Sequence, residues 1–147
     1  MRGISVLAIL VGSIADFILS GTFGLVLVGV VISNQGLSKL PKDQLTPAVL
    51  AAIHGSPGLY AMQLAIGFGC SVFGGLLAAL IAKQRKLLNA VLASWLCVGT
   101  GIIGLVKGAD DISPPIHLLM VVMTPICYAA GAAWALRMRR IPTVAIS

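Results

Sequence analysis

The sequence predicts an all-α membrane protein, a bundle of four transmembrane helices, from its composition and from four long apolar segments. Hydrophobic residues make up 59% of the 147 residues and charged residues only 10%, whereas roughly a quarter of the residues in a soluble protein are charged. A helix needs ~20 mostly apolar residues to cross a bilayer. Four segments reach that length, over residues 4–32, 57–82, 87–106 and 115–136. We therefore expect a single integral membrane domain over residues 1–147 that has the lipid bilayer as its surroundings.

The basic residues predict the orientation of the bundle. Seven of the ten Lys and Arg residues lie at one end of it, namely Arg2, Lys83, Arg85, Lys86, Arg137, Arg139 and Arg140. The other end carries Lys39, Lys42 and Lys107 together with Asp43, Asp110 and Asp111. Because Lys and Arg concentrate on the cytoplasmic side of membrane proteins, both termini are expected in the cytoplasm. The net charge of +6 is thus explained by helix ends, and we expect no nucleic acid partner.

The first span carries Asp16, the only Asp, Glu, Lys or Arg in any of the four apolar segments. The span continues well past Asp16 to Ile32, so we expect it to stay in the protein rather than to be removed as a signal peptide. Asp16 falls near the bilayer centre, where an ionisable side chain costs ~2.5 to 3.5 kcal/mol on insertion scales. Gly12, Ser20 and Gly24 share its helix face at steps of four, so this small, polar stripe should point into the bundle.

Two roles fit Asp16. It can be a structural polar lock that fixes the register of the helices, or a proton or ion site formed by Asp16, Ser20, Thr124 and Tyr128. Ser71 and Thr100 are further hydroxyl donors at similar depth. Removal from water favours the neutral form of a carboxyl group. A polar cavity that leads from Asp16 to a surface would favour the ion site, and a dry, tightly packed Asp16 would favour the lock.

The largest loop, residues 34–56, is expected to contain a short helix over residues 47–53. Thr46 is a suitable N-cap, Pro47 suits the first helical position, and Gly55 is a common stop signal. The helix is apolar, so we expect it to lie on the membrane surface or to cover the mouth of the bundle.

The other three spans are rich in small residues. The second and fourth spans both begin with a Ser-Pro pair, at Ser56 and Ser113, which is a favourable helix start. Thr124-Pro125 predicts a kink in the fourth span. Because helices in lipid associate through close backbone approach, we expect helix packing at Gly67, Ser71, Gly74, Gly75, Ala79, Gly101 and Gly131.

No enzyme is expected, because the sequence contains no catalytic motif and no second membrane carboxylate that could pair with Asp16 for acid and base chemistry. Cys70, Cys97 and Cys127 lie singly, near the centres of three different spans. Single buried thiols of this kind are usually small apolar core residues. We therefore expect neither a metal site nor a cofactor.

Residues 74–90, GGLLAALIAKQRKLLNA, resemble a helix and the following basic turn in a group of small uncharacterised bacterial four-helix membrane proteins. The resemblance implies a location in the cell inner membrane but no established activity. The combination of four helices and a membrane carboxylate in the first is also similar to the small multidrug resistance transporters. This sequence departs from them in its long outer loop, its few aromatic residues and its lack of a Trp-rich wall.

These observations favour a structural or accessory membrane protein that associates with itself or with a larger membrane complex. The alternative is a proton- or cation-coupled small-molecule transporter with Asp16 as its titrating site. A single four-helix bundle has little interior room, so the alternative is expected to require a homodimer in which the two Asp16 residues lie near a shared axis.

Overall fold

The structure is a computed structural model that describes residues 3–107 and 114–138, and it is helical almost throughout this part of the chain. Four helical segments, of which the third is in two parts, are long and apolar enough to cross a membrane. The all-helical class and the four spans are therefore confirmed. The elements are α1 (Val6–Asn34), η1 (Leu37–Lys39), α2 (Lys42–Gly55), α3 (Pro57–Ile81), α4 (Lys86–Ala93), α5 (Trp95–Lys107) and α6 (Pro114–Met138).

Some residues used in the predictions lie outside the described part of the chain. They are Arg2, Asp110, Asp111, Ser113, Arg139 and Arg140.

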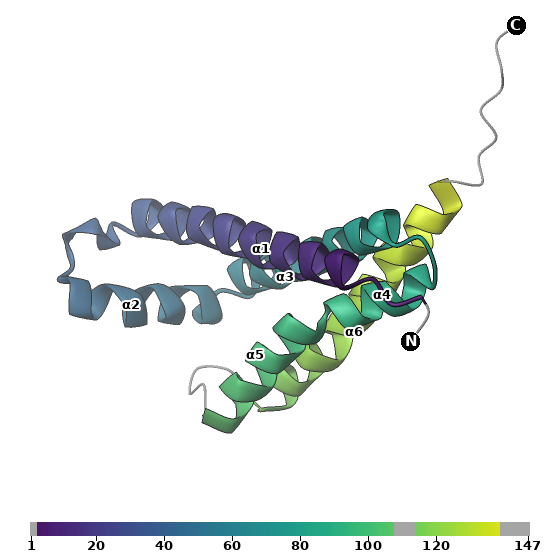
Figure 1. Cartoon of the computed structure of the whole chain (residues 1–147). Coiled ribbons are helices and arrows are strands. Elements are labelled where there is room, and N and C mark those ends of the chain that lie inside the picture. Colours follow the sequence, from purple (N-terminus) through teal and green to yellow (C-terminus); the bar gives the residue numbers. More distant parts are fainter. Residues whose placement is uncertain (1–2, 108–113, 139–147) are drawn as a thin grey trace, which may run out of the picture.

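Helix α3 is the centre of the molecule, because it packs against α1, α4 and α6. Figure 1 shows α1 with α2 extending in one direction and α5 with the first half of α6 in another. Both extend away from the end of the molecule that holds the tight connection between α3 and α4. We call this end the turn end, and the end at which α1 is joined to α2 the α2 end.

Glycines allow the closest helix crossings. A Cβ atom added to Gly12 of α1 would lie 2.8 Å from the carbonyl oxygen of Gly74 in α3. An added Cβ at Gly75 would overlap the carbonyl group of Tyr128 in α6, and one at Gly131 would overlap the carbonyl group of Val72. Only residues without a side chain permit this approach, which is how helices pack tightly in lipid.

The α3–α4 connection is fixed by a buried asparagine. The Asn89 side chain is 0% exposed. Its Nδ2 donates to the carbonyl oxygens of Gly3, Gln84 and Arg85 at 3.0, 2.9 and 3.1 Å, and its Oδ1 accepts from the Ser5 backbone N–H at 2.7 Å. These bonds satisfy a buried amide group, and they attach the start of α1 to the turn end.

The third span, predicted as a single helix over residues 87–106, is interrupted at Ser94. The Ser94 hydroxyl donates to the carbonyl oxygen of Val91 at 2.7 Å, and the Ser94 backbone N–H donates to the same carbonyl at 3.1 Å. Local serine bonds of this kind compete with the helical pattern. The neighbouring carbonyl of Ala93 accepts instead from the Ser13 hydroxyl of α1, at 2.6 Å.

The prediction for the start of α2 was wrong. The helix begins at Lys42 rather than at Pro47, with Pro41 at the cap position and Pro47 inside the helix. Asp43 lies in the first turn, where a negative charge is favourable. Val49 and Ile53 pack in a buried cluster with Leu27 and Val31 of α1. Thus α2 runs back along α1 (Figure 1), and Leu45, in the part of the helix that the capping signals did not predict, packs partly buried against the same cluster.

Candidate functional site

Asp16 is the polar centre of the structure. It is 1% exposed. Its Oδ1 accepts a hydrogen bond from Ser20 at 3.0 Å, and its Oδ2 accepts from Ser71 at 3.0 Å, from the Cys97 thiol at 3.2 Å and from the Tyr128 hydroxyl at 2.8 Å. The four donors belong to α1, α3, α5 and α6. Asp16 is therefore the point at which all four spans meet.

The four donors are divided unevenly between the two carboxyl oxygens of Asp16, with one at Oδ1 and three at Oδ2. An ionised carboxylate has about four lone-pair sites and donates nothing, and hydrogen bonds to a charged acceptor are roughly twice as strong as neutral ones. Within the described residues, every group that donates to Asp16 is neutral. The site therefore replaces water with hydroxyl and thiol groups and contributes no positive charge.

Close packing on both sides of α3 creates this arrangement. A Cβ atom added to Gly74 would lie 3.0 Å from the Asp16 Cβ and 3.0 Å from the Tyr128 hydroxyl oxygen. The absent side chain thus leaves the space in which Asp16 and Tyr128 meet. Gly12, one turn before Asp16, allows α1 to reach this depth, and its carbonyl oxygen also accepts from the Tyr128 hydroxyl at 3.5 Å.

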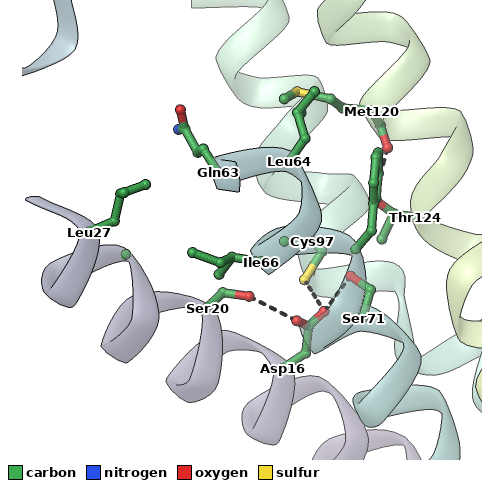
Figure 2. Close-up of a pocket in the computed structure, with 13 residues that line it drawn as sticks. Asp16, Ser20, Leu27, Gln63, Leu64, Ile66, Ser71, Cys97, Met120 and Thr124 are labelled. Atoms are coloured by element: carbon green, nitrogen blue, oxygen red, sulfur yellow. Dashed lines mark hydrogen bonds between the residues drawn. The ribbon is translucent and has the colours of Figure 1, made fainter. Parts of the chain in front are cut away.

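A pocket of about 330 Å³ adjoins Asp16 and extends from it toward the α2 end. Figure 2 shows Asp16 with three of its donors, Ser20, Ser71 and Cys97, beside the pocket, and apolar side chains farther along. Three of the four donors, Ser20, Ser71 and Cys97, line the pocket together with Asp16, whereas Tyr128 does not. The carboxylate therefore lies between the pocket and Tyr128. Further polar groups in the lining are Gln63 and Thr124.

The structure places most of the predicted polar residues at this site, but not in the same way. Ser20, Ser71 and Tyr128 contact Asp16 directly. Thr124 lines the pocket, and its hydroxyl donates to the Met120 carbonyl at 2.9 Å. The expectation for Thr100 was wrong, because its hydroxyl is bonded to carbonyl groups of its own helix.

Sequence reasoning missed Cys97. We expected all three cysteines to be apolar core residues, and Cys70 and Cys127 are indeed buried. Cys97 instead lines the pocket and donates to Asp16. A signal was available, since Cys97 was expected near the centre of its span, at the depth of Asp16.

The predicted packing residues also divide into two groups. Gly74, Gly75 and Gly131 lie at tight helix crossings, Gly101 faces Val121 of α6, and Ser71 and Ala79 are buried in α3. Gly67 does not fit the expectation, because an added Cβ there would meet nothing within 4 Å in the described structure. It lies instead on the wall of the pocket. The regular spacing along α3 predicted a continuous contact face, but α5 and α6 diverge from α3 toward the α2 end (Figure 1).

The start of α6 is tied to α5 by a histidine. His117 Nε2 donates to the Gly101 carbonyl oxygen at 2.9 Å, and an added Cβ at Gly104 would lie 3.1 Å from the same ring. These contacts hold α5 and the first half of α6 together on one side of the pocket.

No protein-family model, no curated protein and no solved structure matches the chain. The resemblance to small bacterial four-helix membrane proteins therefore stays a prediction, and function is inferred from the geometry of the site.

Proposed function

We propose that this chain is a proton- or cation-coupled small-molecule transporter of the bacterial inner membrane, with Asp16 as the residue that titrates. The observation that carries the proposal is the pocket beside Asp16, in which the carboxylate and three of its donors line one continuous space. Its volume of about 330 Å³ lies at the lower end of the usual range for small-molecule sites, ~300 to 1,000 Å³.

The hydrogen bonds suggest how protonation of Asp16 would act on the helices. A protonated carboxyl group donates one hydrogen bond, so when Oδ2 carries the proton, one hydroxyl next to that oxygen must turn and accept. Hydroxyl groups can do this, since they both donate and accept. The contacts of Asp16 with Ser71, Cys97 and Tyr128 would therefore rearrange, and they join three different helices to α1. In this way a proton, or a cation that replaces it, affects the walls of the pocket.

The proposal does not require a homodimer. The pocket is formed by one chain, and Asp16 is surrounded by donors of its own chain. With both termini in the cytoplasm, the pocket would open toward the outer side, where α2 would lie.

A structural or accessory role is the second candidate, and one observation favours it. Asp16 receives hydrogen bonds from all four spans, as a polar lock requires, and such bonds contribute ~0.6 kcal/mol each on average in membrane proteins. In this role the carboxylate would hold the bundle together, and the exposed apolar surface would contact a second copy or a larger membrane complex.

Asp16→Asn separates the two roles, with Asp43→Asn as the matched control, because Asp43 is an exposed carboxylate on α2. Three quantities are measured in reconstituted protein: thermal stability, proton flux under an imposed pH gradient, and the infrared carbonyl band of a protonated carboxyl group. We expect wild type and Asp43→Asn to show flux and a carboxyl band that titrates with pH, and Asp16→Asn to fold but to lose both.

The opposite outcome is equally specific. If the carboxyl band of Asp16 does not change with pH, if no variant shows flux, and if Asp16→Asn lowers stability or alters the oligomeric state, Asp16 is a lock and the transporter proposal is wrong. A neutral hydrogen bond is weaker than a charge-assisted one by about 1 kcal/mol, so the lock predicts a measurable loss of stability.

A further inference from the structure

The turn end presents a cluster of basic side chains, and neither of the two described acidic residues lies at this end. Lys83 and Arg85 are exposed in the α3–α4 connection, Lys86 is half-buried at the start of α4, and Arg137 is exposed in the last turn of α6. The described part of the chain contains two acidic residues, of which Asp16 is buried in the centre and Asp43 lies on α2. The positive charge of this end is therefore not neutralised by the described residues.

Arg85 has a backbone conformation that is unusual for an arginine. Its φ and ψ angles are 45° and 47°, and it is the only non-glycine residue with a positive φ in the described structure. Glycine or asparagine adopts this left-handed conformation at lower free-energy cost. Strain of this kind often marks a position at which the side chain has a function.

The surrounding contacts hold this strained residue in place. Asn89 donates to the carbonyl oxygens of Gln84 and Arg85, and the Arg85 side chain passes over Gly3, where an added Cβ would lie 3.1 Å from the Arg85 Cδ. The basic residues of the turn are therefore displayed by a fixed backbone rather than by a loose loop.

Apolar side chains border the cluster. Leu87 and Leu88, next to Lys86, are 50% and 38% exposed, at the start of a segment long and apolar enough to cross a membrane. The basic groups thus lie where the apolar surface ends, which is the depth of phospholipid headgroups. A phospholipid could place its phosphate beside the basic groups and its acyl chains along the leucines. A soluble phosphate compound would contact the basic groups but not the leucines.

We propose that Lys83, Arg85, Lys86 and Arg137 form a binding site for the phosphate groups of anionic phospholipids. The site is separate from the Asp16 pocket and does not depend on the function proposed for it. The attraction of a basic residue to an anionic membrane surface corresponds to about a five-fold change in affinity for each residue.

The test uses the full chain in lipid nanodiscs that contain phosphatidylglycerol and phosphatidylcholine, with native mass spectrometry to count the lipids that remain bound. Arg85→Asn removes the charge but suits the left-handed backbone, so we expect about a five-fold loss of preference for phosphatidylglycerol and no loss of thermal stability. Lys83→Gln with Arg85→Asn and Lys86→Gln should lose about 100-fold. Lys39→Gln with Lys42→Gln, at the α2 end, is the matched control and should keep the preference. High salt should weaken the preference of the wild-type protein for phosphatidylglycerol.

The proposal is overturned if wild type binds the two lipids equally, or if the triple variant keeps the wild-type preference at unchanged stability. An equal loss in the control variant would also overturn it, because the effect would then come from total charge. Displacement of phosphatidylglycerol by millimolar inorganic phosphate would show that the site binds soluble phosphate rather than lipid.

Discussion

Replacing Gly75 by alanine tests whether close backbone approach holds α3 against α6. The added Cβ would overlap the carbonyl group of Tyr128. A backbone group cannot rotate away as a flexible side chain can, so the two helices must separate. Gly67→Ala is the matched control on the same helix, because the added Cβ there meets nothing within 4 Å.

The expected changes in the free energy of unfolding have opposite signs in the two variants. Alanine is favoured over glycine in a helix interior by about 1 kcal/mol, and Gly67→Ala should gain up to this amount. Overpacking costs about 1 to 3 kcal/mol, and overlap with backbone atoms places Gly75→Ala at the upper end. After the helix gain is subtracted, Gly75→Ala should lose about 2 kcal/mol, so the two variants should differ by about 3 kcal/mol. Any shift of Tyr128 would also weaken its 2.8 Å bond to Asp16.

The assay is reversible unfolding in mixed detergent micelles, followed by circular dichroism, with the free energy of unfolding compared among wild type and the two variants. If Gly75→Ala is as stable as Gly67→Ala, the reasoning is refuted, and the α3–α6 crossing is not as close as described.

Two further substitutions test polar groups that join distant parts of the chain. Asn89→Ala removes the partner of the Ser5 N–H and the side-chain donor of the Gly3, Gln84 and Arg85 carbonyl groups, although the Arg85 carbonyl keeps the backbone N–H of residue 89. Because Gln84 and Arg85 are exposed and water can replace some of these bonds, at about 1 kcal/mol for each bond lost we expect a loss of about 1 to 3 kcal/mol and faster hydrogen exchange at Ser5. Unchanged exchange there would contradict the role given to Asn89. Ser13→Ala leaves the Ala93 carbonyl without its 2.6 Å donor, and the free energy of unfolding should fall by about 1 to 3 kcal/mol. Thr22→Ala is the control, because it removes an exposed bond within α1 and should cost little. Equal losses in the two variants, measured by thermal unfolding, would argue against the Ser13 contact.

The spans and part of the Asp16 site could be predicted because they depend on local properties. Segment length and hydropathy determine which helices can cross a membrane, and depth along each span was enough to suggest Ser71 and Tyr128 as partners of Asp16. Depth alone could not separate Thr100, whose hydroxyl bonds within its own helix, from Cys97, which turns toward Asp16. That difference depends on the rotation of α5 about its axis.

Other features could not be read from local sequence because they depend on contacts between distant residues. The interruption at Ser94 is accompanied by the bond from Ser13 to the Ala93 carbonyl, across 80 positions of the chain. The early start of α2 is accompanied by packing of Leu45 against the cluster shared with α1, which capping signals do not report. The role of Asn89 likewise required the start of α1 to lie beside the α3–α4 connection.

The interruption at Ser94 divides the third span between two mechanical units. Helix α4 belongs to the unit that contains α1, through the Ser13 bond, and α5 belongs to the unit that contains the first half of α6, through His117. Among the described residues, the Cys97 thiol makes the one polar side-chain link from α5 to α1, and thiols are weak donors. Because the helical pattern of main-chain bonds is broken at Ser94, α5 can tilt without carrying α4 with it. Such a tilt would change the width of the pocket, which Cys97 of α5 lines.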